Sequence, residues 1–387
     1  MRKVLRKSFC FLLIISIISS FALLHGASAE GGAVLPGSVT GKNWMSAVPD
    51  SKKLYEINIP GTHDSAMAYC KNSTNNFVKL MGIPLINSGK YAKTQVLSIG
   101  EQLDAGVRFF DLRFGAKKGE LRLCHGDLDD VKAVNDKLWI LDLFPIFAVY
   151  ELLGMPFVDL DTEFYAYEDE KCETPSTYDT AIETIKAFLE KNPSETVILK
   201  LKRENGEYAP YINLLKAKID TLRQQKNSST GKPFLYTENG NGIYSFMPSL
   251  AETRGQIILL TPDFEALQCG NDLDMYNGTG MNEYMGMYFN FHNHWDIEAE
   301  QKRDEVKTYI EENSRDVSGG EKAIYGSVLH TSSNVVMKDS PADIEKTVGE
   351  WLYADGTLKS GHFYGWFLSD FLDKEKCEKI WKTNFSN

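Results

Sequence analysis

Short apolar runs recur along the chain, each of a length that suits a buried strand, and amphipathic patterns of helical length separate several of them. Strands that alternate with helices, without internal repeats, are typical of a (β/α) barrel with mostly parallel strands. This alternation restricts the fold class more than any other feature. The predicted strands lie at 54–59, 107–112, 121–124, 196–201, 256–260, 285–290, 323–329 and 365–368, and the predicted helices at 177–191, 211–225, 297–313, 341–353 and 374–382.

The connection between the runs at 107–112 and 121–124 has no helical pattern, and Gly115 and Gly119 flank a turn within it. We therefore expect a hairpin-like or irregular link at this point and an imperfect barrel. The predicted fold class is α/β, a distorted TIM (β/α)8 barrel formed by a single domain over 30–387. Barrels of this kind often form one unit of about 200–400 residues.

Residues 1–29 have the pattern of a secretory signal peptide. Basic residues precede an apolar run at 9–24, and Ala27, Ser28 and Ala29 form a small-residue cleavage site. A membrane anchor is the alternative interpretation, but this run is shorter than the roughly 20 residues that a bilayer span needs. We expect a secreted protein.

The charge of the chain argues against binding to nucleic acid. The formal net charge is −11, and removal of residues 1–29 takes away four basic residues and no acidic ones, which gives −15 for the mature chain. The mature chain also contains no C-x-x-C motif and an odd number of cysteines, so we expect neither a disulfide framework nor a zinc cluster. These cysteines are Cys70, Cys124, Cys172, Cys269 and Cys377.

Three strand-like ends carry groups suited to acid/base catalysis. The turn at 58–65, Asn-Ile-Pro-Gly-Thr-His-Asp-Ser, places His63 and Asp64 directly after an apolar run. The second run ends in Asp111 and Arg113, and the third ends in His125. An isolated His-Asp pair could equally form an ordinary turn in which the carboxylate caps backbone amides.

These segments resemble the catalytic X-type region of bacterial phosphatidylinositol-specific phospholipase C, which carries an IPGTHDS-like turn, an FD[IL]R strand end and an HG pair. The resemblance extends from about Trp44 to the C-terminus and implies a distorted TIM barrel with its site at the C-terminal ends of the strands. Further similar motifs follow in the same order at 192–196, 201–204, 254–260 and 364–370.

The resemblance implies roles for five predicted catalytic residues. His63 would be the general base, oriented by Asp370 on the last strand. His125 would be the general acid, with Asp64 as its partner, and Arg113 would contact the phosphate and the attacking hydroxyl. Two histidines in opposite protonation states can perform both proton transfers, because imidazole pKa values lie near working pH.

The same comparison bears on metal use. Eukaryotic relatives hold calcium through an Asn after the first His and through acids on the next strand, whereas this chain has Asp64 and Arg113 at those positions. A fixed guanidinium in place of a divalent ion favours metal-independent cleavage. We therefore expect no cofactor and no metal, with Asp111 as a supporting charge at the substrate.

Substrate contacts are predicted at Lys202 and Glu204, which match positions that contact the inositol ring in the resembled family, although an exposed Lys-Arg-Glu strand end is also common. His292 and His294 stand where the bacterial enzymes carry an Asp and a stacking Tyr, and we assign them to the substrate pocket. The stretch Thr261-Pro262-Asp263 replaces an inositol-contacting Arg, which leaves the headgroup open.

His292, His294 and Asp296 alternate, which would place all three on one face of a strand. Such a set could hold a metal, line the pocket or belong to the surface. His330 and His362 are interpreted as structural.

An insertion at about 127–175 departs most from the compact bacterial pattern and includes an apolar segment at 139–147. It could form a lid or a membrane-contacting rim, or an extra helix packed on the barrel. In the rim interpretation, Trp139, Phe144 and Phe147 would insert at the lipid interface.

The expected function is that of a secreted, metal-independent phosphodiesterase similar to phosphatidylinositol-specific phospholipase C, releasing diacylglycerol and inositol 1,2-cyclic phosphate. Its expected partners are phosphatidylinositol or a related phospholipid and, transiently, a membrane surface, with the protein acting as a monomer. Two alternatives stay open: a metal-dependent phosphodiesterase with a related barrel, and a protein that binds inositol lipids or sugar phosphates without catalysis.

Overall fold

The computed structural model describes the chain in several stretches, which are 37–72, 92–126, 164–273, 275–318, 325–335 and 338–386. The predicted signal peptide and most of the predicted insertion lie outside these residues, as do Trp139, Phe144 and Phe147.

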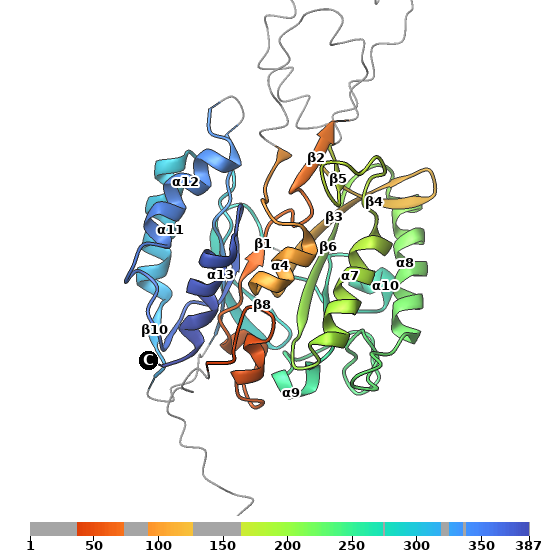
Figure 1. Cartoon of the computed structure of the whole chain (residues 1–387), viewed down its shortest axis with the longest axis horizontal. Helices are drawn as coiled ribbons and strands as arrows, with labels where there is room; N and C mark the ends of the chain where they lie inside the picture. The colour runs from red at the N-terminus through yellow and green to blue at the C-terminus, as the bar shows by residue number, and fades with distance from the viewer. Residues whose placement is uncertain are drawn as a thin grey trace, which may run out of the picture.

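Parallel strands form most of a ring (Figure 1). One set pairs in the order β1–β3–β6–β7 and a second in the order β9–β11–β13. Isolated parallel bridges from Ile59 to Trp366 and from Thr62 to Ser369 place β1 beside β13, which joins the two sets. The strands are β1 (Gly61–Thr62), β3 (Phe109–Lys117), β6 (Val197–Asn205), β7 (Ile257–Leu260), β9 (Met287–His292), β11 (Gly326–His330) and β13 (Trp366–Leu368).

The ring is open between β7 and β9, so the predicted eight-stranded closure is not observed in the described part of the chain. At this opening the strand β8 (Thr279–Tyr284) pairs antiparallel to β9 and forms the edge of its sheet. The predicted imperfect barrel is therefore confirmed. In a regular barrel a parallel strand, connected through a helix, would close the ring at this point, whereas here β8 and β9 form an antiparallel hairpin.

The antiparallel extension of the sheet follows the predicted hairpin after β3. The strand β4 (Glu120–His125) pairs antiparallel to β3, and β5 (Phe164–Tyr167) pairs antiparallel to both β4 and β2 (Tyr69–Asn72). The described end of the predicted insertion thus belongs to the sheet that carries His125.

Helices cover the outside of the ring, with α11, α12 and α13 on one side and α7, α8 and α10 on the other (Figure 1). The longer ones are α4 (Ile99–Ala105), α7 (Tyr178–Lys191), α8 (Tyr208–Gln224), α11 (Ala299–Asn313), α12 (Pro341–Leu352) and α13 (Lys374–Trp381). The shorter elements are η1 (Trp44–Ala47), η2 (Leu54–Glu56), α9 (Leu250–Thr253), α10 (Phe264–Leu267), β10 (Arg315–Asp316), β12 (His362–Phe363) and η4 (Lys382–Asn384).

Most predicted elements lie within a few residues of the observed ones, and Thr177 caps α7 as the sequence indicates. The predicted strand at 54–59 is wrong, because Leu54–Glu56 forms a 3-10 helix and only the end of the run reaches the sheet. Helix α4 was not predicted, although Ser98 and Glu101 form a capping box at its start and Gly106, with φ of 118°, ends it.

Aromatic residues fill the interior of the ring. The ring of Trp366 lies 5.5 Å from that of Phe109 and 5.5 Å from that of Phe289, so β13, β3 and β9 meet at one cluster. Gly61 permits this close packing, because a Cβ at that position would collide with the carbonyl oxygen of Phe367 and with Cβ of Phe109.

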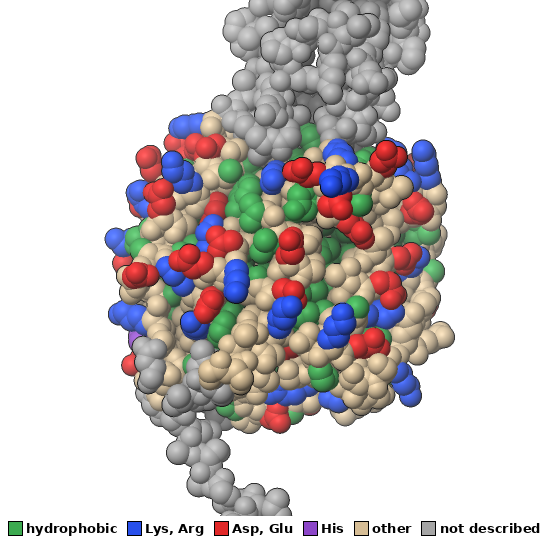
Figure 2. Space-filling model, in the orientation of Figure 1, with side chains coloured by type: hydrophobic (Ala, Val, Ile, Leu, Met, Phe, Trp, Pro, Cys, Tyr) green, Lys and Arg blue, Asp and Glu red, His purple; other side chains and the backbone are tan. Residues whose placement is uncertain are grey.

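The visible surface carries basic and acidic side chains that alternate over its area rather than gathering by sign (Figure 2). None of the helices that the structure describes is both long enough and apolar enough to cross a membrane. None of the five cysteines from Cys70 to Cys377, all of which the structure describes, takes part in a disulfide.

Candidate active site

The turn after β1 brings His63 and Asp64 into the barrel. Asp64 has a φ of 41°, a left-handed conformation that Asp tolerates better than most residues. The backbone N–H of His63 donates to the carbonyl of Ser369, and the N–H of Ser65 donates to the carbonyl of Asp111. The turn is therefore held between β13 and β3, the two strands that carry its partners.

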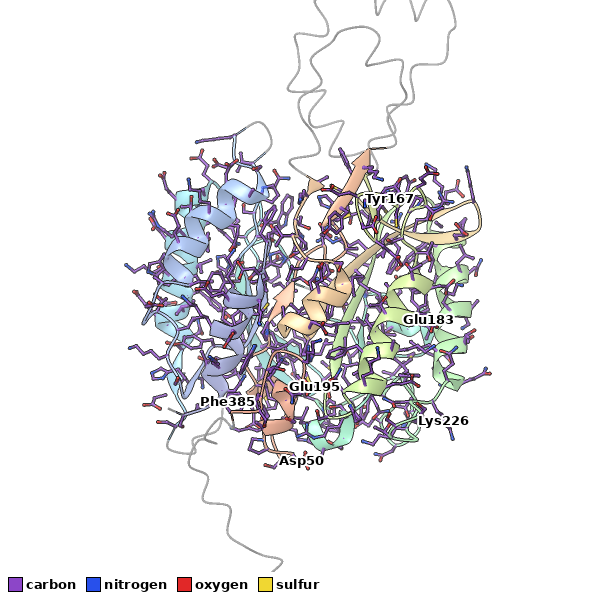
Figure 3. The ribbon with its side chains drawn as sticks, in the orientation of Figure 1. Asp50, Tyr167, Glu183, Glu195, Lys226 and Phe385 are labelled. Carbon is purple, nitrogen blue, oxygen red and sulfur yellow. The ribbon has the colours of Figure 1, made fainter. Side chains whose placement is uncertain are left out.

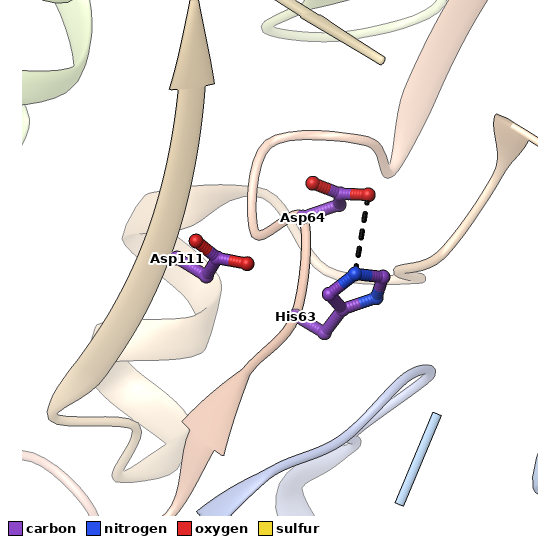
Figure 4. A group of neighbouring side chains, drawn as sticks. All are labelled: His63, Asp64 and Asp111. Atoms are coloured by element: carbon purple, nitrogen blue, oxygen red, sulfur yellow. Dashed lines mark ion pairs between the residues drawn. The ribbon is translucent and has the colours of Figure 1, made fainter. Parts of the chain in front are cut away.

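Alternation along β3 places Asp111 and Arg113 on one face, and the parallel register with β6 pairs them with Lys200 and Lys202. Figure 4 shows the carboxylate of Asp111 pointing from β3 toward the loop of His63 and Asp64. Asp64 and Asp111 are fully buried, whereas the side chains of His63 and Arg113 are each 15% exposed. The side chains of His63 and Arg113 thus lie above two buried carboxylates and are partly open to solvent.

Arg113 is the centre of this cluster. Its Nε lies 2.6 Å from Asp64 Oδ1, its Nη2 lies 3.2 Å from Asp111 Oδ2, and its Nη1 lies 3.3 Å from Glu204 Oε2. These carboxylates outweigh the effect of burial and raise the pKa of Arg113 well above its usual value. The guanidinium is therefore a permanent, fixed positive charge.

The contacts of His63 define its tautomer. Its Nε2 lies 2.7 Å from Nη2 of Arg113, and a guanidinium can only donate, so Nε2 is an acceptor without a proton. The proton is on Nδ1, which lies 2.9 Å from Asp370 Oδ1 and donates to it. Burial, followed by the charge of Arg113, lowers the pKa of His63 well below its usual value. His63 is a neutral base with its lone pair toward the guanidinium.

Asp370 follows β13 and is buried. Burial, and then the charges of Asp64 and Glu345, raise its pKa well above the usual range of a carboxyl. The carboxyl of Asp370 therefore lies where it can accept the Nδ1–H of His63 and could stabilise an imidazolium at that residue.

His125, at the end of β4, has the opposite protonation state. Its Nδ1 lies 2.6 Å from Asp64 Oδ2 and 3.1 Å from Glu204 Oε1. Although burial opposes its charged form, these two carboxylates raise the pKa of His125 to about 10. The rings of His125 and His63 lie 6.5 Å apart, so a proton donor and a proton acceptor face one another across the site.

Several curated proteins have a sequence similar to that of this chain. The 1-phosphatidylinositol phosphodiesterase of Listeria monocytogenes is 30% identical over 227 residues, which cover 59% of this chain and 50% of that protein. The protein of the same name from Staphylococcus aureus is 31% identical over 140 residues, covering 35% of this chain and 37% of its own. The resemblance to bacterial phosphatidylinositol-specific phospholipases C is confirmed.

The chain spans about half or less of the length of these curated relatives, and no family model matches it. A solved mutant phosphatidylinositol-specific phospholipase C from Staphylococcus aureus superposes with a TM-score of 0.60 at 18% identity, over 89% of this chain and 98% of that one. The Listeria monocytogenes phospholipase structure gives 0.53 at 20% identity, over 90% and 100%. At these identities the structures show a shared fold.

Among the residues that the structure describes, two groups of side chains converge closely enough to hold a metal ion. They are His63, Asp64 and Asp111, and Asp64, His125 and Glu204. Both groups share Asp64, and Arg113 contacts a carboxylate of each. A divalent ion would compete with a guanidinium already bound to the same oxygens, so the donor set suits a fixed organic cation better than a metal.

Glu204 lies in the same cluster. Its carboxylate contacts Arg113 and His125 and accepts from the N–H of Gly126, and its contact with the inositol ring stays a prediction. Arg113, His125 and Lys202 lower the pKa of Glu204 despite its burial. It therefore acts as a second carboxylate for His125. Lys202 is exposed on the same strand face, where the expectation of a substrate contact stays a prediction.

The structure does not bring His292 and His294 to this cluster. His292 pairs in register with Leu329 rather than with the inward Val328, so it lies on the outer face of β9. Its Nε2 lies 3.3 Å from Glu305 of α11 and its ring lies against Tyr309 of the same helix. The assignment of His292 to the substrate pocket is wrong, because the side chain fills the layer between the sheet and α11.

Strand β9 ends at His292, so His294 and Asp296 follow it in a loop rather than continuing one strand face. His294 Nδ1 lies 2.9 Å from Glu305 and its Nε2 lies 3.4 Å from Asp296. His292, His294 and Asp296 are not among the described groups of side chains that converge closely enough to bind a metal. His294 lies beside α11, so its assignment to the substrate pocket is also wrong.

Three residues that sequence reasoning missed lie at the site. The ring of His330 lies 4.7 Å from that of His63, and Lys200 pairs in register with Asp111. Gln95 donates from Nε2 to the carbonyls of His63 and Ser369, which ties the two loops together. Alternation with Lys202 could have indicated Lys200, whereas no sequence signal marks Gln95.

Proposed function

We propose that this protein is a phosphatidylinositol-specific phospholipase C-like phosphodiesterase that releases diacylglycerol and inositol 1,2-cyclic phosphate without a metal. The observation that carries the proposal is the pair of histidines in opposite protonation states on either side of a fixed Arg113. The curated relatives of similar sequence are named 1-phosphatidylinositol phosphodiesterase, which supports the substrate class.

The reaction begins at the lone pair on Nε2 of His63. Arg113 holds this nitrogen before substrate binds, and a phosphate diester draws the guanidinium onto its own oxygens. His63 then takes the proton of the inositol 2-hydroxyl, and the hydroxyl oxygen attacks phosphorus. Asp370 stabilises the new imidazolium through Nδ1.

The bond from phosphorus to the glycerol oxygen breaks as the new P–O bond forms. His125 gives its Nε2 proton to the leaving oxygen, because its Nδ1 is held by Asp64 and Glu204. Arg113 stabilises the charge that gathers on the phosphoryl oxygens. Proton uptake at His63 balances proton release at His125, and no other reactant is needed.

We further propose that residues 1–29 direct secretion, that residues 30–387 form one domain, and that the monomer acts at a membrane surface. The apolar run and cleavage pattern at the N-terminus support export. The curated relatives are named for phosphatidylinositol, a membrane lipid, which supports action at a membrane surface.

A metal-dependent phosphodiesterase is the second candidate, because two carboxylate and histidine groups converge around Asp64. The two candidates differ in their response to a chelator and in their product. A metal enzyme would lose activity in EDTA and would form no cyclic phosphate.

The test is phosphorus NMR of the mature protein with phosphatidylinositol micelles in EDTA. We expect a cyclic phosphodiester signal that disappears in His63→Ala and persists in the control variant His362→Ala. His362 stacks on Tyr364 and lies outside the cluster around Arg113. No turnover in EDTA but recovery with a divalent ion would support the metal enzyme. Binding without turnover under both conditions would support a lipid-binding protein.

A further inference from the structure

His330 is the last residue of β11, and the strand register gives its direction. Val328, two residues earlier, pairs with Phe291 of β9 and Trp366 of β13, and Trp366 belongs to the aromatic cluster inside the ring. Because alternate residues share a face, His330 points into the barrel as well. The neighbouring Leu329 pairs with the outward His292.

Inside the barrel the ring of His330 packs against His63. Their centroids lie 4.7 Å apart with an angle of 65° between the planes, and His330 is 4% exposed. The two hydrogen bonds of His63, to Asp370 and Arg113, lie in the plane of its ring and do not stop the ring from tilting out of that plane. A packed ring beside it blocks this tilt.

The position of His330 is itself held at two points. Its Nδ1 lies 2.7 Å from Oγ of the buried Ser332, and its backbone carbonyl lies 3.2 Å from Nδ1 of His292. The ring therefore cannot swing away without breaking a buried contact.

The charges around His330 keep it neutral. The positive charges of Lys302 on α11, Lys200 on β6 and Arg113 on β3 oppose a further positive charge on His330. Burial and these neighbours lower the pKa of His330 well below its usual value. A neutral, buried ring next to His63 excludes water from that side of the base.

We propose that His330 is a positioning residue that holds the ring of His63 in its reactive orientation and shields it from water. The inference rests on the proposed role of His63 as the base. It assigns a function to the ring of His330 and none to its nitrogens in the reaction.

Replacement of the ring by a small side chain tests this role. In His330→Ala we expect water to enter beside His63, the pKa of His63 to rise toward its ordinary value, and kcat to fall about 10- to 100-fold with little change in KM. In His330→Phe the ring remains, so the pKa of His63 stays low and kcat stays within a few-fold of the wild type.

The measurement combines NMR titration of the labelled His63 side chain in the mature protein with kcat and KM on phosphatidylinositol micelles. His362→Phe is the matched control. His330→Asn gives the same test if His330→Ala does not fold, because it offers Ser332 a polar partner without a ring. The inference is overturned if loss of the ring leaves both readouts unchanged, or if folded His330→Phe is as impaired as the small variants.

The titration also separates this inference from the proposed function. It needs no substrate, so it reports on the packing of His63 even if the wild type does not cleave phosphatidylinositol. A wild type without turnover would refute the proposed function, and an unchanged His63 titration in the small variants would refute the role of His330.

Discussion

Two arginines, Arg108 just before β3 and Arg113 in the middle of the strand, show how one segment of chain serves structure and a polar site separately. Arg108, just before the strand, has no exposed surface and contacts Glu195 at 2.9 Å, and its other donors bind the backbone carbonyls of Leu103, Val107, Gly41 and Lys42. Figure 3 shows Glu195 at the end of the barrel opposite to Tyr167.

Arg113 has a different set of partners. It faces Asp64, Asp111 and Glu204 and touches His63 Nε2, and part of its guanidinium remains open to solvent. Arg108 satisfies its donors with one buried carboxylate and backbone carbonyls, which stabilises the fold, whereas Arg113 shares its donors with three carboxylates and the proposed base His63. The two arginines come from the same segment of chain, so their different roles arise from their different partners.

The largest expected effect is on catalysis at Arg113. In Arg113→Lys we expect kcat/KM to fall on the order of 10²–10³-fold, because an ammonium cannot hold three carboxylates and a phosphate in one plane. Thermal unfolding should change little, since a positive charge remains. Micelle assays with parallel calorimetry measure both, and near-normal turnover in this variant would contradict the central role of the guanidinium.

Replacement of Arg108 should lower stability instead of activity. Arg108→Met leaves the buried Glu195 without its cationic partner, so we expect the free energy of unfolding to fall by about 3–5 kcal/mol. The folded fraction should keep its kcat. Urea unfolding measures the change, and adding Glu195→Met should restore much of the loss. A large loss of kcat in folded Arg108→Met would contradict the distinction between the structural Arg108 and the site residue Arg113.

The pH dependence of kcat/KM sharpens the comparison further. The active form needs neutral His63 and charged His125, so we expect an acid limb below the ordinary imidazole pKa of 6.5 and an alkaline limb near 10. In Glu204→Gln one of the two carboxylates that raise the pKa of His125 is lost, and the alkaline limb should move to lower pH. An alkaline limb that does not move would show that Asp64 alone sets this pKa.

The comparison also predicts how stability depends on pH. The pKa of His125 rises from 6.5 to about 10 on folding, so its contribution is fully present below pH 6.5 and is lost as the pH rises toward 10. Urea unfolding between these pH values should show a declining free energy of unfolding, and His125→Gln should flatten the decline. An equal slope in both proteins would assign the decline to other groups.

The prediction of which residues share one cluster agrees with the structure where local motifs carried it. His63 with Asp64, Asp111 with Arg113, and His125 each follow a short apolar run, and the structure brings them together with Asp370 as expected. Their roles in the reaction stay proposals.

The prediction failed where direction depended on register. His292 and His294 read as an alternating pair, but β9 ends between them and turns His292 toward α11. His330 read as structural, yet the same register turns it toward His63. A shift of one residue exchanges the two faces of a strand, and the sequence contains no local signal that distinguishes them.

The sequence by itself determined the alternation of strands and helices, the motifs at three strand ends and the acidic net charge, because these depend on residue type and spacing alone. The tertiary structure decided which carboxylates share Arg113, the proton positions on His63 and His125, and the opening of the ring at β8. Those properties arise from charges and packing between segments far apart in the chain, where burial and neighbouring groups set each pKa.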